Sequence, residues 1–194
     1  METTARFAPA ERSPWRHQLP PVVAAEVGRR RSLILARARG RVLDLDEPGA
    51  LELVHRVSSG PAGPDPTEPD VTDPDDGYDT IVSTCRLVDL ADLPAALAGL
   101  RRLLAPDGEL FLLEPVNRPG MASLALSSAF TLMPALAGLH LGRDVVRTTR
   151  AADLAVVDLE RFTIPTPVWP LRRFIQARVI LVDGRGHINE GASS

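Results

Sequence analysis

The chain has 194 residues, of which 44% are hydrophobic and 24% charged, and its formal net charge is -3. This length and balance predict one globular domain with a substantial core. The weakly acidic balance gives no electrostatic case for nucleic acid, whose binders usually carry a basic face. The single cysteine, Cys85, excludes an intrachain disulfide framework and a cysteine-rich zinc site.

The N-terminal part combines an irregular stretch with a helical one. Residues 1–20 are polar and proline-rich, so we expect an arm that lies on the domain. No basic stretch followed by an apolar run occurs here, which predicts a cytoplasmic protein. Apolar residues recur at helical spacing in residues 22–38, and this helix carries Arg29, Arg30 and Arg31. A phosphate contact is one explanation of the three arginines, and a solvated helix face is the one we expect.

A strand, a short helix and an acidic segment follow. Residues 42–45 predict the first core strand, and residues 50–57 predict a helix. Residues 58–77 are rich in proline and acidic residues and contain no basic residue. Such a segment buries little apolar surface, so we expect an extended loop. Its carboxylates match no calcium-binding spacing, and the sequence predicts no metal site.

The most regular pattern lies in residues 78–116. Tyr78–Ser83 is a β-branched run, and Asp92 has the features of a helix N-cap. Ala105–Gly108 predicts a turn, and Leu110–Leu113 predicts a strand that is buried on both faces. This order is a βαβ unit, in which two parallel strands are joined by a right-handed crossover.

The last third combines an uncharged run with two further strands. Residues 121–139 carry no charge over a length that could span a membrane. Serine, threonine, proline and glycine interrupt them, so we expect a buried or cap helix, with contact to a membrane surface as the alternative. Residues 143–152 predict a helix, and residues 154–164 and 174–182 predict strands with alternating faces. Residues 183–194 predict a polar tail.

This element order resembles that of the class I S-adenosylmethionine-dependent methyltransferases over about residues 30–182. The segment 36–45 (ARARGRVLDL) resembles the start of the family's first strand, and 77–84 (GYDTIVST) resembles its fourth. The segment 100–110 (LRRLLAPDGEL) is similar to a family helix-turn-strand segment. The segment 138–144 (GLHLGRD) resembles the subgroup that acts on quinone precursors, phospholipids and small thiols.

The resemblance implies a Rossmann-like α/β fold, flanked by helices, with a truncated and mostly parallel sheet. The expected sheet retains the family's strands one, four, five, seven and six. Strands two and three are absent, because the segment between Leu45 and Tyr78 is too short and mostly acidic loop. The first strand would then lie at an edge of the sheet. We expect the N-terminal arm, the acidic loop or a second chain to cover it, which makes a homo- or hetero-oligomer a candidate assembly.

The family's cofactor turn, D-x-G-x-G-x-G, is altered here. Its glycines let the backbone approach S-adenosylmethionine closely, where a Cβ atom would intrude. The three glycine positions are occupied by Asp46, Pro48 and Ala50, and Gly49 is out of phase. Asp46 also adds a carboxylate beside that of the cofactor's amino acid moiety. The resemblance therefore implies an S-adenosylmethionine site in which binding is weakened or lost.

The resemblance also implies positions for the remaining site residues. Glu114 and Arg143 would line the substrate cleft, with capping roles as the alternative. His140 would be a general base, with a structural histidine as the alternative. The cofactor positions lie at the carboxyl ends of the first two retained strands, and for Asp44 a helix or turn cap is the alternative. They are Asp44, Asp46, Gly49, Ser83 and Thr84.

Two functions follow from the resemblance. The first is methyl transfer from S-adenosylmethionine to a small acceptor, with lipophilic acceptors among the candidates. The second is a catalytically inactive pseudo-methyltransferase that acts as a partner or regulatory subunit.

Overall fold

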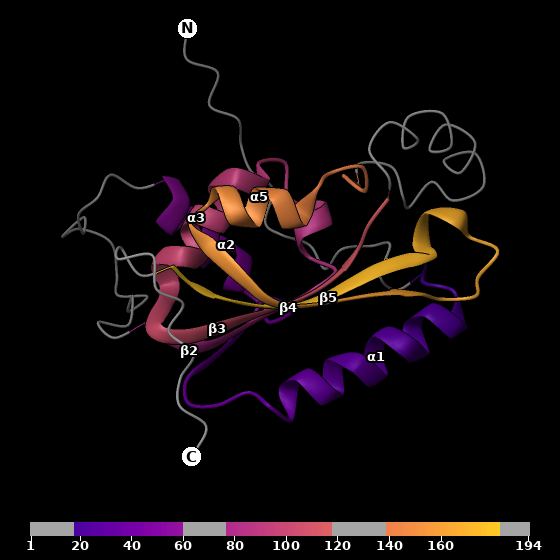
Figure 1. Ribbon diagram of the computed structural model, residues 1–194, viewed down its shortest axis with the longest axis horizontal. Coiled ribbons are helices and arrows are strands. Elements are labelled where there is room, and N and C mark those ends of the chain that lie inside the picture. Colours follow the sequence, from indigo (N-terminus) through magenta and orange to yellow (C-terminus); the bar gives the residue numbers. More distant parts are fainter. Residues whose placement is uncertain (1–17, 60–76, 118–138, 183–194) are drawn as a thin grey trace, which may run out of the picture.

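The computed structural model describes residues 18–59, 77–117 and 139–182. The predicted arm, acidic loop, uncharged segment and polar tail lie almost entirely outside these residues. The described residues form a five-stranded sheet with helices on both faces (Figure 1). In chain order the elements are α1 (Pro21–Leu35), β1 (Val42–Asp44), α2 (Ala50–Ser59), β2 (Tyr78–Thr84), the 3-10 helix η2 (Leu87–Asp89), α3 (Leu93–Leu103), β3 (Leu104–Pro115), α5 (Val145–Ala151), β4 (Leu154–Thr163), the 3-10 helix η4 (Trp169–Leu171) and β5 (Arg173–Leu181).

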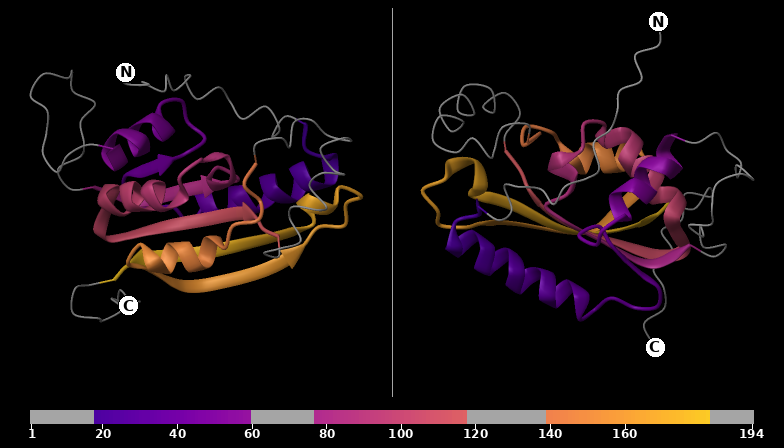
Figure 2. Two further views of the ribbon diagram at one scale, coloured as in Figure 1. Left: turned by 90° about the horizontal axis from the view of Figure 1, so that it is seen from above. Right: turned by 180° about the vertical axis from the view of Figure 1, so that it is seen from behind.

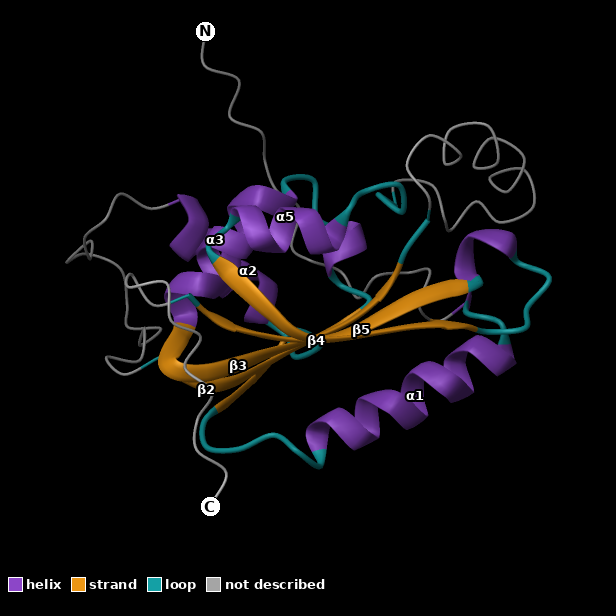
Figure 3. Ribbon diagram, viewed as in Figure 1, coloured by secondary structure: helices purple, strands orange, loops and turns teal. Residues whose placement is uncertain are grey.

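The strand order confirms the predicted fold class. The sheet runs β1-β2-β3-β5-β4, which is the expected order of strands one, four, five, seven and six. Figure 3 shows the strands as one layer between α1 and the other helices. β1, β2 and β3 pair in parallel, and β5 pairs antiparallel with both of its neighbours. β1 lies at the edge of the described sheet and is three residues long. Its outer edge has no partner strand among the described residues and is open to pairing with another chain.

Helices α2, α3 and α5 cover one face of the sheet. Two successive crossovers, β1 to β2 and β2 to β3, move in the same direction along the sheet, so their right-handedness places α2 and α3 on the same face. The two helices approach closely at Gly99, where a Cβ atom would lie 2.2 Å from Ser58 Oγ and 2.7 Å from the Val54 carbonyl oxygen. Asp92 caps α3 as predicted, since its Oδ1 accepts a hydrogen bond from the Ala95 amide at 3.0 Å.

Helix α1 covers part of the opposite face, as the view from behind in Figure 2 shows. Arg30 fixes it to β4. Its Nη1 lies 2.7 Å from Glu160 Oε2, and its guanidinium lies 3.6 Å from the centre of the Phe162 ring. The expected solvated face is therefore wrong for Arg30, and also for Arg31, which binds carboxylates in the sheet. The expected solvated face holds for Arg29, whose exposed side chain pairs with Glu26 on the same helix and with no other side chain in the described part of the chain.

The helix ends before residues 105–108, as predicted, but these residues lie inside the strand and not before it. α3 ends at Leu103 and β3 begins at Leu104, so the predicted turn is an irregularity within β3. Tyr78 pairs with Leu104, but Thr80 pairs with Glu109, so β3 holds the additional residues. Gly108 permits this irregularity, because a Cβ atom there would lie 2.6 Å from the Tyr78 carbonyl oxygen.

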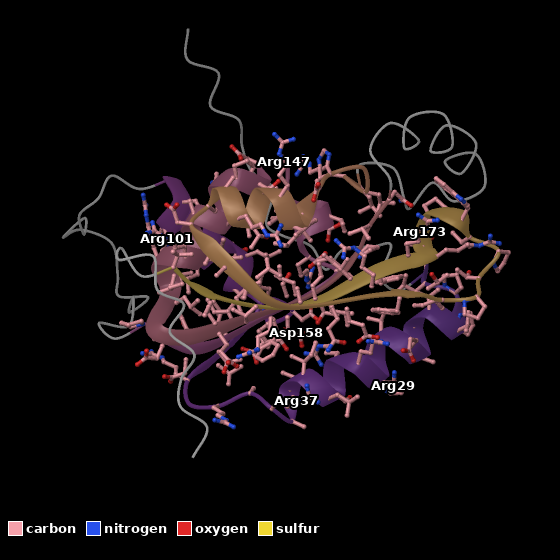
Figure 4. All side chains as sticks on the ribbon, viewed as in Figure 1. Arg29, Arg37, Arg101, Arg147, Asp158 and Arg173 are labelled. Atoms are coloured by element: carbon pink, nitrogen blue, oxygen red, sulfur yellow. The ribbon has the colours of Figure 1, made fainter. Side chains whose placement is uncertain are left out.

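The predicted alternation along β4 is also interrupted. Val156 pairs with Val179 and Asp158 pairs with Arg178, so Val157 is an extra residue that reverses the faces. Beyond this irregularity Asp158 lies on the α1 face, as its label in Figure 4 shows. No helix among the described residues is long and apolar enough to cross a membrane.

Candidate functional site

Asp44 ends β1 on the α1 face of the sheet, and its side chain is almost fully buried. Its Oδ2 is paired with the Arg31 guanidinium of α1. Its Oδ1 accepts a hydrogen bond from the Asp46 amide at 3.0 Å. The alternative capping role is therefore observed. The carboxylate that the resemblance assigned to a cofactor is bound by the chain's own groups.

Asp46 connects two arginines that come from different parts of the chain. Its Oδ2 lies 3.2 Å from Arg31 Nε, and its Oδ1 accepts a hydrogen bond from Arg86 Nε at 2.8 Å. Arg86 lies two residues beyond the end of β2 and is only 7% exposed. Neither arginine was expected in this site from the sequence. The available signal was Arg86 itself, a charged residue at the carboxyl end of a buried strand.

Gly49 turns the chain into the first turn of α2. Its φ of +84° is a left-handed conformation that favours glycine, and its carbonyl oxygen accepts a hydrogen bond from the Leu53 amide at 2.9 Å. The chain then enters α2 on the same face as α3. Open α/β sheets bind ligands in the crevice where successive connections leave in opposite directions. The described parallel strands have no such switch point, because both of their crossovers lie on one face.

A second polar cluster surrounds Glu114 at the carboxyl end of β3. Its Oε1 accepts hydrogen bonds from Ser83 Oγ at 2.7 Å, from the Arg86 amide at 3.1 Å and from the Leu87 amide at 3.3 Å. Cys85 adopts a left-handed φ of 55°, which turns the chain after β2 so that these two successive amides reach one oxygen. Cys85 is fully buried, as expected for a small core residue.

Burial determines the protonation of Glu114. The side chain is fully buried, and this raises the pKa of its carboxyl group to about 8, against the opposing effect of the three hydrogen bonds. The group is therefore mainly neutral at pH 7. Its second oxygen, Oε2, has no hydrogen-bond partner among the described residues.

Ser83 and Thr84 point to opposite faces of β2 and do not form one site. Ser83 pairs in register with Leu112 and shares the α3 face with Glu114. Thr84 lies on the α1 face, where it is fully buried and its Oγ1 has no partner among the described residues. Two unpartnered polar atoms, on opposite faces, are thus buried near the carboxyl edge of the sheet.

His140 and Arg143 hold the segment before α5 against η2. The His140 amide donates to the Val88 carbonyl oxygen at 2.8 Å, and burial, with a smaller effect of Arg143, lowers the pKa of its ring. The Arg143 guanidinium donates to the carbonyl oxygens of Leu90 and Ala91 at 2.5 and 2.6 Å. These contacts are structural. No hydrogen bond among the described residues joins the His140 ring to Glu114.

These residues do not fit S-adenosylmethionine in the family's manner. Asp46 occupies a glycine position and its side chain bridges Arg31 and Arg86, so a cofactor would have to break two ion pairs to approach the backbone. Ala50, at another glycine position, is buried at the start of α2. Within the described ranges, no group of three or more His, Cys, Asp or Glu side chains is arranged to hold a metal ion.

No protein-family model matches the sequence, and no curated protein matches it as a relative. Solved structures do resemble the chain. An arsenic(III) S-adenosylmethionine methyltransferase from Chlamydomonas reinhardtii is 24% identical at a TM-score of 0.39, over 56% of this chain and 39% of its own. An O-methyltransferase family protein from Burkholderia thailandensis is 18% identical at a TM-score of 0.40, over 56% of this chain and 32% of its own.

A third structure is matched over a larger part of both chains. The 1,6-didemethyltoxoflavin-N1-methyltransferase from Burkholderia thailandensis is 16% identical at a TM-score of 0.44, over 84% of this chain and 77% of its own. The chain spans less than two thirds of the arsenic methyltransferase and of the O-methyltransferase family protein. These are distant similarities, and the fold class follows from the strand order of the chain itself.

Proposed function

We propose that this chain is a shortened member of the class I methyltransferase family that has lost the cofactor site and acts as a partner or regulatory subunit. The ion pairs that link Arg31, Asp44, Asp46 and Arg86 carry this proposal. They occupy the end of β1, where the family's glycine-rich turn would hold S-adenosylmethionine. The absence of a switch point among the described strands supports it independently.

Isothermal titration of the full chain with S-adenosylmethionine, and separately with S-adenosylhomocysteine, tests the proposal. We expect no heat of binding up to millimolar cofactor for the wild-type chain. A Kd in the low micromolar range would overturn the proposal. Loss of that binding in Asp44→Ala would then place the cofactor at the end of β1.

Methyl transfer to a small acceptor is the second candidate function. Two unpartnered buried atoms near the carboxyl edge, Glu114 Oε2 and Thr84 Oγ1, favour it, because a catalytic role is one explanation for a buried polar group without a partner. Release of S-adenosylhomocysteine, measured with a panel of phenols, thiols and quinols, would support this candidate over the first.

The partner role has a separate test. We expect the partner to contact the edge strand β1, a strand of three residues on which the Val42 side chain is exposed. A partner that adds a strand there would protect the Val42–Asp44 amides from hydrogen exchange. Unchanged exchange of these amides between dilute and concentrated protein would exclude self-association through β1.

A further inference from the structure

A cavity lies at the carboxyl edge of the sheet, away from the ion pairs of Asp44 and Asp46. Its volume is about 450 Å³, which is within the usual size range of small-molecule pockets. Apolar side chains from α5, β5 and the residue that follows β3 form part of its wall. They include Val116, Val145 and Ile175.

Three arginines from separate segments line this cavity. Arg143 precedes α5, Arg161 lies near the end of β4, and Arg173 begins β5. Arg143 is engaged with two backbone carbonyl oxygens. Arg161 and Arg173 are exposed, and their side chains have no hydrogen bond or ion pair among the described residues. Figure 4 labels Arg173 beside the start of β5.

The strand register places two of these charges together. Arg161 pairs with Ile175 and Thr163 pairs with Arg173, so the two arginines are diagonal neighbours on the face that α5 covers. Diagonal neighbours are about 7–8 Å apart, within reach of long side chains. One anionic group could therefore contact both guanidinium groups.

The described lining residues supply little negative charge to this cavity. The one carboxylate among them is Asp144, whose Oδ1 caps α5 by accepting a hydrogen bond from the Arg147 amide. The described lining thus has three positive charges against one negative charge.

We propose that this cavity binds a small organic anion with an apolar body, such as a medium-chain fatty acid or an aryl carboxylate. Arg161 and Arg173 bind the anionic head, and the apolar wall packs against the body. The site extends beyond the proposed partner role and does not require S-adenosylmethionine, so either proposal can fail without the other.

Titration calorimetry on the full chain tests this site with three probes. Decanoate has the head and the body, 1-decanol has the body alone, and inorganic phosphate has the charge alone. We expect decanoate to bind at one site, with 1-decanol and phosphate at least about tenfold weaker. Raising the salt from about 50 mM to about 300 mM should weaken decanoate binding severalfold.

Matched variants locate the site. Arg161→Gln with Arg173→Gln should weaken decanoate binding by about tenfold or more. Arg101→Gln removes an exposed arginine from α3, at the opposite end of the view in Figure 4 from Arg173. This control should leave decanoate binding unchanged. No decanoate binding, equal binding of 1-decanol, or equal binding by the double variant would each overturn the proposal. The probe comparison on the wild-type chain stands even where the double variant fails to fold.

Discussion

Arg86 and Asp46 are 40 residues apart in the sequence, and their side chains meet at 2.8 Å between the ends of β2 and β1. Arg86 is 7% exposed, so this ion pair is largely shielded from water. The contact stabilises the edge strand against its neighbour. It also occupies the end of β1, where the resemblance to class I methyltransferases implies a cofactor turn.

Removing one partner of this ion pair should destabilise the fold. Arg86→Gln leaves a poorly solvated carboxylate, and we expect the free energy of unfolding to fall by about 2–4 kcal/mol in urea denaturation. A double-mutant cycle with Asp46→Asn should give a coupling energy on the order of 1–3 kcal/mol. Arg178→Gln removes a solvent-exposed ion pair with Glu109 and should cost less than about 1 kcal/mol. Equal losses for Arg86 and Arg178 would contradict the burial argument.

Glu114 should make stability depend on pH. Its pKa is raised in the folded chain to about 8, chiefly by burial, so the folded state holds its proton more tightly than the unfolded state. This contribution to the free energy of unfolding is fully present below about pH 4.5 and is lost as the pH rises to about 8. The Glu114→Gln side chain stays neutral. At pH 8 the free energy of unfolding of this variant should therefore exceed that of the wild type by on the order of 2–4 kcal/mol.

The difference between wild type and Glu114→Gln should shrink toward pH 5, measured by urea denaturation across the pH range. Glu52→Gln removes an exposed carboxylate from α2 and is the matched control. Parallel pH profiles for the wild type and Glu114→Gln would show that this carboxyl group is ionised in the folded chain.

Gly99 should be intolerant of a side chain. A Cβ atom there would overlap Ser58 Oγ and the Val54 carbonyl oxygen, so Gly99→Ala forces α2 and α3 apart. We expect a loss of about 1–3 kcal/mol in the free energy of unfolding, although alanine is the better helix former. Gly28→Ala on α1 meets nothing within 4 Å and should stabilise the protein by up to about 1 kcal/mol. A stabilised Gly99→Ala variant would show that the two helices separate readily.

Arg30 should anchor α1 more strongly than its neighbour Arg29 does. Arg30→Met keeps the aliphatic stem but loses the Glu160 ion pair and the contact with the Phe162 ring. Thermal unfolding and urea denaturation should show a loss of about 1–2 kcal/mol. Arg29→Met loses only an exposed pair with Glu26 and should leave stability unchanged. Similar results for the two variants would mean that α1 is held by its apolar face alone.

The sequence alone determined the order and type of the elements. The βαβ pattern of residues 78–116, the Asp92 cap and the two late strands follow from local periodicity and capping, which act within a few residues. The short segment between Leu45 and Tyr78 also determined the strand order, because it cannot supply two further strands. The irregularity within β3 was not predicted, because the same turn-forming residues occur both inside a strand and between two elements.

The tertiary structure alone decided what the site residues contact. Asp44, Asp46 and Glu114 were correctly placed at strand ends, but their partners Arg31 and Arg86 come from a helix and a loop far away in the chain. Ser83 and Thr84 are neighbours in the sequence, but they point to opposite faces of β2. The register of β4 with β5 places Arg161 diagonally beside Arg173. Periodicity assigns a residue to an element, whereas the ion pairs and pockets depend on how those elements pack.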